Sequence, residues 1–369
     1  AYRIYNAPPT QRRPALGGYV MLRGWRQEPE LATCQSRTSS VVSYRFRNHE
    51  GGSGCNPHIF ATLTLMPASL QAFIAIFVVG ALLRSFALLT KAHAERLATL
   101  VFSVCLPATI LVSLDAVTFS STAWKLPVAA CLVTLPLLLC SWLLTRLLQL
   151  TRPKQGGFLL ATGLINSVYF SYPVVLATFG EEGLGHAVLF DVGQSLLTLT
   201  VVYGLAVWFG ASAPTTGSAM VRFFSAPPLW ALCGILALKL VGLSLPSWLH
   251  QLLTPIHLTT TPLASLVLGL SISVTALRHN APLALLGVAV RMGGGLLLGL
   301  SAVLILDLTG LERAIVILVS AMPSAVNSVI FATETHLDED LVASIVALSI
   351  CFGIAVLPWL PKLSMFLLG

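Results

Sequence analysis

Charged side chains are scarce in this chain. Asp, Glu, Lys and Arg together make up 9% of its 369 residues, whereas 56% of the residues are hydrophobic. A soluble globular domain carries about 25% charged residues, so a chain of this composition lacks the polar surface that water requires. The composition therefore predicts an all-α integral membrane protein that crosses the bilayer several times.

The chain also lacks the spacings that mark metal, cofactor and catalytic sites. Its seven cysteines are scattered without a Cys-x-x-Cys or Cys/His pattern, so neither a metal site nor a redox pair is indicated. It contains no His-Glu-x-x-His, no Gly-x-Ser-x-Gly and no phosphate-binding loop. These absences argue against an enzyme, and no cofactor is expected. His186, His257 and His336 fall at the ends of hydrophobic segments, where we expect interfacial positions.

Residues 1–65 have no long hydrophobic run and hold most of the excess positive charge. They contain eight Arg, no Lys and three Glu, within a chain whose net charge is +7. Because the excess sits in one tail, no basic surface for nucleic acid is indicated. We expect this tail to be disordered or to lie upstream of the working protein, since Met66 stands where a natural start would fall. A transit peptide is the alternative, because the tail is rich in Arg and poor in acid.

From Met66 onward the chain contains ten hydrophobic runs of about twenty residues, each long enough to span a bilayer. The predicted spans lie near residues 68–89, 97–115, 125–149, 157–178, 185–209, 224–243, 255–277, 281–306, 311–332 and 341–365. A short loop at 211–223 separates a first five-helix repeat at 66–210 from a second at 224–369. Because five is odd, the second half enters the membrane from the opposite side, which predicts an inverted repeat.

Lys and Arg residues predict the orientation of these spans. They gather in the first, third, fifth and seventh loops and at the adjoining span ends. Positive charge favours the cytoplasmic side, so the odd-numbered loops are predicted to face the cytoplasm. Both ends of the helical domain are then non-cytoplasmic, in a plasma membrane or bacterial inner membrane.

Spans four and nine are interrupted in the same way. The first contains Asn166 and Pro173, the second contains Pro323 and Asn327, and a Ser follows each Asn. Pro removes a backbone N–H and breaks the helix, which lipid tolerates only where the break lines a cavity or packs inside protein. Paired breaks predict crossing broken helices four and nine, whose half-helix N-termini hold an anionic solute. The alternative is that the prolines are simple kinks and the Asn side chains bridge helices. The predicted substrate-binding residues are Asn166, Tyr169, Pro173, Pro323, Asn327 and Ser328.

Three polar residues inside spans are candidates for coupling transport to an ion. Asp191 lies within span five, where an ionisable group is functional by default and could carry a proton. Its alternative role is to satisfy the start of that helix near the interface. Gln194 lies about one turn further on the same face and could share the site. Arg291 lies inside span eight, where it could pair with a carboxylate or hold a substrate anion, unless it snorkels to the surface.

Three motifs carry a family resemblance. Asn-Ser-x-Tyr-Phe-Ser-Tyr-Pro begins at Asn166, Met-Pro-Ser-Ala-Val-Asn-Ser begins at Met322, and Thr-Pro-Leu-Ala-Ser-Leu-x-Leu-Gly-Leu begins at Thr261. Over about residues 66–367 the chain resembles the auxin efflux carrier family, which includes bacterial malate-permease-like and plant PIN-type carriers. The resemblance implies a transporter of a small organic anion, with a scaffold opposite a transport domain, in a homodimer surrounded by membrane lipid. It also implies that the crossover Pro and Asn residues line the substrate site. The short loop at 211–223 favours a bacterial-type member.

Two other function classes remain open at this stage. Bile-acid-type sodium symporters and sodium/proton antiporters share the broken-helix design. An antiporter usually needs an acidic residue beside the crossover, and the cores of spans four and nine contain none. A membrane sensor or intramembrane enzyme would need a regulatory domain, a nucleophile or a ligand set, which the motifs do not supply. The sequence therefore favours a secondary active transporter.

Overall fold

The computed structural model describes residues 67–117, 123–210, 225–272 and 281–359. Every regular element within these ranges is a helix, and seven helices are long and apolar enough to cross a membrane. The prediction of an all-α membrane protein is therefore confirmed. The tail at 1–65 and the loop at 211–223 lie outside the described residues, so the predictions made for them are not tested.

The first half of the described chain forms α2 (Ala68–Ser85), α3 (Lys91–Leu100), α4 (Leu106–Ala116), α5 (Lys125–Leu147), α6 (Arg152–Gly163), α7 (Tyr172–Leu197) and α8 (Tyr203–Phe209). The second half forms α10 (Pro227–Leu240), α11 (Ser247–Ser271), α12 (Ala281–Val288), α13 (Gly295–Leu306), α14 (Gly310–Ser320), α15 (Asn327–Glu334), α16 (Glu339–Val356) and the short η6 (Leu357–Trp359). Wider π-helical turns join some of them into longer rods: η1 (Val101–Cys105), η2 (Ser167–Ser171), η3 (Thr198–Val202) and η5 (Ala289–Gly294).

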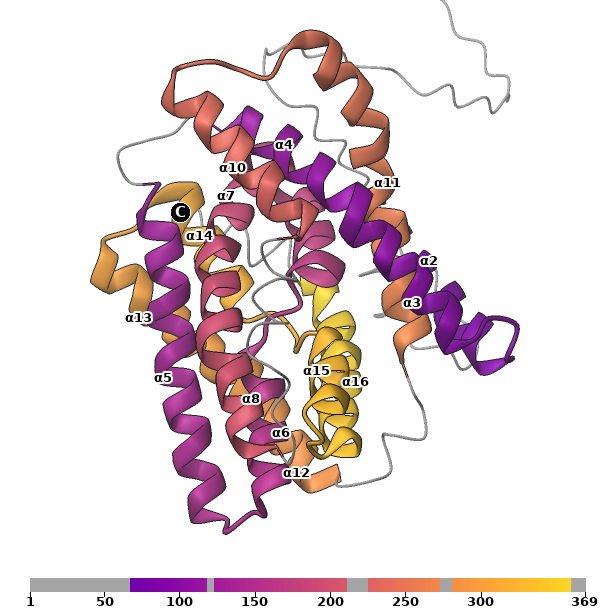
Figure 1. Ribbon diagram of the computed structural model, residues 1–369, viewed down its shortest axis with the longest axis vertical. Coiled ribbons are helices and arrows are strands. Elements are labelled where there is room, and N and C mark those ends of the chain that lie inside the picture. Colours follow the sequence, from indigo (N-terminus) through magenta and orange to yellow (C-terminus); the bar gives the residue numbers. More distant parts are fainter. Residues whose placement is uncertain (1–66, 118–122, 211–224, 273–280, 360–369) are drawn as a thin grey trace, which may run out of the picture. The chain divides into compact units, whose positions relative to one another are not determined.

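The helices pack in two groups (Figure 1). In one group, α2 and α4 pack against α11, and α10 packs against α4. In the other, α5 contacts α6, α7 and α13, while α16 contacts α6, α12 and α15. The groups meet where α4 contacts α7 and where α11 contacts η2. We call the first the α2–α4–α10–α11 group, after its members. The second, which contains α5, α6, α7, α12, α13, α15 and α16, we call the α5–α16 group.

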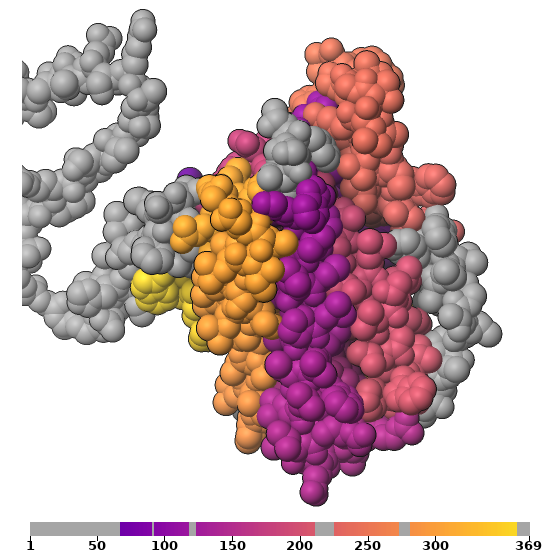
Figure 2. Space-filling view, turned by 90° about the vertical axis from the view of Figure 1, so that its left-hand side faces the viewer, coloured from indigo at the N-terminus to yellow at the C-terminus, as the bar shows by residue number. Residues whose placement is uncertain are grey.

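A row of exposed leucines shows which medium surrounds the α5–α16 group. Leu135, Leu139, Leu143 and Leu147 on α5 are 44%, 56%, 47% and 81% exposed. Their four-residue spacing puts them on one helix face. Such an exposed apolar face is unfavourable in water and favourable in lipid. Figure 2 shows α5 as a ridge between α13 and the α7–α8 segment. This outward apolar face is the membrane-facing surface that the composition predicts.

The fourth and fifth predicted spans are joined by a kink inside α7. Gly180 adopts φ 69° and ψ −164°, a conformation open to glycine and costly for other residues. The chain reverses there, directly before Glu181 and Glu182. The predicted spans end at 178 and begin again at 185, and the kink occupies the connection between them.

Candidate functional site

The two interrupted spans meet at their interruptions. Span four stops as α6 at Gly163 and resumes as η2 at Ser167, and span nine stops as α14 at Ser320 and resumes as α15 at Asn327. Between the half-helices, Ile165 and Ser324 pair as an isolated antiparallel bridge. The flanking hydrogen bonds run from Asn166 N to Pro323 O at 2.9 Å and from Ala325 N to Leu164 O at 3.1 Å. Each break therefore satisfies backbone groups of the other, as a membrane interior requires.

The two prolines stand in different places relative to the breaks. Pro323 lies within the break of span nine, as the sequence predicted. Pro173 instead lies at the second position of α7, and the break of span four falls at residues 164–166. Pro173 lacks the N–H that would bond to the carbonyl one turn back, and its ring crowds that carbonyl. The π-helical turn η2 directly before α7 fits this effect, because a wider turn accommodates the hydrogen bond that is lost at a proline.

The carboxyl end of α6 is closed by side chains from three other elements. The carbonyl oxygens of Ala161, Thr162 and Gly163 accept hydrogen bonds from Ser324 Oγ, Arg291 Nη1 and Gln194 Nε2 at 2.5, 3.0 and 2.9 Å. The same guanidinium also donates from Nη2 to the carbonyl of Ser320, the last residue of α14, at 2.5 Å. These carbonyls carry the partial negative charge of two helix ends, so the polar partners offset that charge.

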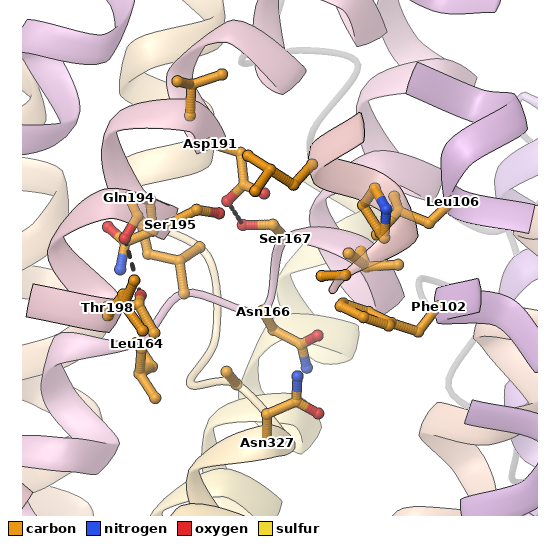
Figure 3. A pocket seen from close by; sticks show the side chains of 18 of the residues that line it. Phe102, Leu106, Leu164, Asn166, Ser167, Asp191, Gln194, Ser195, Thr198 and Asn327 are labelled. Atoms are coloured by element: carbon orange, nitrogen blue, oxygen red, sulfur yellow. Dashed lines mark hydrogen bonds between the residues drawn. The ribbon is translucent and has the colours of Figure 1, made fainter. Parts of the chain in front are cut away.

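The amino ends of the resumed half-helices face a cavity of about 650 Å³. Asn166, Asn327 and Tyr169 line this cavity, together with Asp191 and Gln194. Figure 3 shows the side chains of Asn166 and Asn327 pointing toward each other, with their amide nitrogens closest. Asn166 is 2% exposed, and its Nδ2 has no hydrogen-bond partner. The unpartnered Nδ2 of Asn166, with the Asn327 amide facing it, suits a ligand that supplies acceptor oxygens.

Asp191 holds its carboxylate at one of these amino ends, that of η2. Its Oδ1 accepts from Ser167 Oγ at 2.5 Å, drawn in Figure 3, and its Oδ2 accepts from Tyr172 Oη at 3.1 Å. Ser167 opens η2, so the carboxylate lies at the positive end of the resumed span four. This places Asp191 beside the crossover, although it belongs to the fifth predicted span.

Not every predicted site residue reaches the cavity. Pro173, Pro323 and Ser328 are buried behind its wall, and Ser328 Oγ has no hydrogen-bond partner. Arg291 is fully buried and also lies outside the lining, bound to the two helix carboxyl ends. Gln194 lines the cavity, but its amide is engaged, because Oε1 also accepts from Thr134 Oγ1 at 2.6 Å.

The sequence missed two features of the site. Glu334, at the end of α15, lines the cavity, so two carboxyl groups face it, whereas no Lys, Arg or His does among the described residues. His257 was predicted at the end of a span, and in the structure its side chain is 2% exposed. Its Nε2 lies 2.8 Å from Glu181 Oε1, and its Nδ1 lies 3.2 Å from Thr109 Oγ1. No spacing in the sequence signals this contact between residues 76 positions apart.

A multi-pass helical membrane protein whose interrupted helices line a cavity has the architecture of a membrane transporter. The chain matches the family described as membrane transport protein over residues 65–215 and 211–361. The chain belongs to that family, which confirms the resemblance found in the motifs.

Two archaeal proteins are similar over nearly their whole length. An uncharacterized transporter of Methanocaldococcus jannaschii is 29% identical over 303 residues, which cover 79% of this chain and 97% of that protein. An uncharacterized transporter of Methanothermobacter thermautotrophicus is 29% identical over 289 residues, 77% of this chain and 94% of that protein. Both similarities agree with transport, rather than catalysis, as the task of this chain.

Proposed function

We propose that this protein is a secondary active transporter that moves a small organic anion by alternating access. The substrate binds where broken helices four and nine cross, in a fold of ten spans arranged as an inverted repeat of five and five. The observation that carries the proposal is the pair of facing amide nitrogens, Asn166 and Asn327, at the amino ends of two half-helices in one cavity.

The preference for an anion rests on the uneven treatment of the helix ends. The carboxyl ends of α6 and α14 are already offset by Arg291 and Gln194. The amino ends at Ser167 and Asn327 open toward the cavity and carry a partial positive charge. A carboxylate can be held there by backbone N–H groups and the two amides without a buried Lys or Arg.

Asp191 supplies the coupling in this proposal. Its ionised form already occupies the amino end of η2 through Ser167. A bound anion and an ionised Asp191 repel each other across a cavity that also holds Glu334. The anion therefore binds together with a proton on Asp191, and the two move across the membrane in the same step.

Alternating access needs one open and one closed side. Tyr203, Glu334 and Pro227 line the cavity. Glu334 ends α15 and Pro227 begins α10, so both adjoin predicted odd-numbered loops, and the charge pattern predicts these loops to be cytoplasmic. The opposite side is held by the Glu181–His257 contact and by Ser113 Oγ, 3.3 Å from Glu181 Oε2. These bonds join α7 to α4 and α11, so they cross between the two helix groups. We propose that this state is open inward and that the outer contact breaks when the α5–α16 group moves.

The experiment that tests the function begins with a thermal-stability screen of the purified chain against small organic acids. The acid that stabilises the protein is then offered to vesicles containing wild-type protein or Asn327→Ala. Uptake by the wild type and its loss in the variant are expected. Equal uptake by both proteins would remove the crossover as the substrate site.

A further inference from the structure

Arg291 has an unusual place for an arginine in a membrane protein. It lies in η5, inside the continuous rod α12–η5–α13, and among the described residues it is the largest fully buried side chain. A charged group at such depth is costly unless strong partners surround it. Within the described residues no carboxylate pairs with it, and it does not line the cavity. The charge must therefore be matched by something other than an acid or a bound substrate.

What matches the charge is a pair of helix carboxyl ends. Nη1 donates to Thr162 O at 3.0 Å and Nη2 donates to Ser320 O at 2.5 Å. Ser320 is the last residue of α14 and Thr162 is the last but one of α6, the two half-helices that stop at the crossover. Each carboxyl end carries roughly half a negative charge, so one guanidinium balances the pair.

Backbone carbonyls at half-helix carboxyl ends are also the ligands that coupled transporters offer to sodium ions. Here the guanidinium already holds one such oxygen from each half-helix. We propose that Arg291 is a positioning residue that acts as a resident cation, tying the crossover together and making it independent of sodium. This inference rests on the proposed function, because it assigns the crossover to transport.

The neighbouring helix surface is shaped for this contact. Gly295 follows Arg291 by one helical turn, and a Cβ at Gly295 would overlap the Ser320 carbonyl oxygen and approach Nη2 within 2.7 Å. The absence of a side chain there lets α13 approach the end of α14 closely. Gly293, two residues before Gly295, has open space where a Cβ would lie. Alanine at Gly295 therefore disturbs the contact between Arg291 and Ser320, and alanine at Gly293 is the matched control in the same rod.

The test compares thermal unfolding of the purified full chain in sodium chloride, potassium chloride and choline chloride at equal ionic strength. Wild type is expected to have the same Tm in all three salts. Arg291→Gln is expected to lose about 5 °C or more in potassium chloride and to regain stability in sodium chloride in a saturable way. Arg291→Lys keeps a cation at the site and is expected to show no sodium response.

The variant Gly295→Ala keeps the guanidinium and serves if Arg291→Gln does not fold. It is expected to become responsive to sodium, whereas Gly293→Ala behaves as wild type. Sodium stabilisation of the wild type would overturn the proposal. So would lost stability in Arg291→Gln without a sodium response, which makes Arg291 structural only, or identical salt responses of the two glycine variants.

The outcome is separable from that of the proposed function, because sodium is the only ligand in this test. A failed sodium prediction together with lost uptake in Asn327→Ala removes the role of Arg291 and leaves the substrate site standing. A confirmed sodium prediction with normal uptake in Asn327→Ala does the reverse.

Discussion

The backbone N–H of Asn166 donates to the carbonyl oxygen of Pro323 at 2.9 Å, across 157 positions of sequence between two interrupted helices. This bond fixes the Asn166 side chain opposite Asn327, which begins α15 (Figure 3). The amide pair is therefore positioned by backbone pairing, and changing either side chain leaves the crossover itself in place.

Removing either amide is expected to weaken substrate binding. A hydrogen bond to a charged group contributes about 1.5–3 kcal/mol. At substrate concentrations below saturation, Asn166→Ala and Asn327→Ala should therefore each lower the uptake rate about 10- to 100-fold. Initial rates in proteoliposomes measure the effect. Thr333→Val is the control, because Thr333 is exposed on the same helix and does not line the cavity. A loss of equal size in Thr333→Val would point to damage of α15 rather than of the site.

Asp191→Asn is expected to abolish the pH dependence of transport. Wild-type affinity should tighten as pH falls, because the anion binds with protonated Asp191 and an ionised carboxylate repels it. The amide of the variant keeps an acceptor for Ser167 and carries no charge, so its affinity should be flat across pH. Binding measured by calorimetry over a pH series tests this. Glu334→Gln should retain the wild-type slope, and a retained slope in Asp191→Asn would assign the proton to another group.

Glu181→Gln is expected to loosen the outer side of the transporter. It removes the charge that faces His257, at 2.8 Å, and so weakens a contact between the two helix groups. A cysteine at Val188, which lines the cavity, should then react faster with an impermeant thiol reagent added from the outer side. Native cysteines are replaced by serine in this assay. Glu182→Gln is the matched control, since Glu182 is the exposed neighbour, and the outer contact is no gate if both variants react at the wild-type rate.

Gly269→Ala is expected to lower stability, whereas Gly234→Ala is not. A Cβ at Gly269 would overlap the backbone carbonyl of Phe77 where α11 crosses α2, and such overpacking costs about 1–3 kcal/mol. Gly234 on α10 has open space, and alanine in a helix gains about 0.5–1 kcal/mol over glycine. Thermal unfolding in detergent compares them. A lower Tm for Gly234→Ala than for Gly269→Ala would contradict the close helix crossing.

Much of this arrangement could be predicted from the sequence, because it depends on local composition. In lipid, the backbone groups of a long apolar run find hydrogen-bond partners within a helix. The all-α membrane class and most of the spans could therefore be predicted. Asn166 and Asn327 could be singled out because Pro and Asn interrupt those runs. Pro173 was a poor guide to the position of the break. Proline is tolerated in the first turn of a helix, so it can mark where a helix begins rather than where one is interrupted.

The rest depends on contacts between distant segments. Arg291 binds carbonyls 29 and 129 residues away, and any residue type can supply a carbonyl, so no motif records the pairing. His257 stands at a predicted span end and is buried because α4 and α7 cover it. The cavity position of Glu334 follows from where α15 points after the break, which the length of a hydrophobic run does not specify.

The most direct measurement is the structure, by electron cryomicroscopy, of the purified protein with the organic acid that stabilises it. The account predicts density for a carboxylate between the amide nitrogens of Asn166 and Asn327, at the amino ends of η2 and α15. Density for the acid elsewhere, with this space left empty, would contradict it.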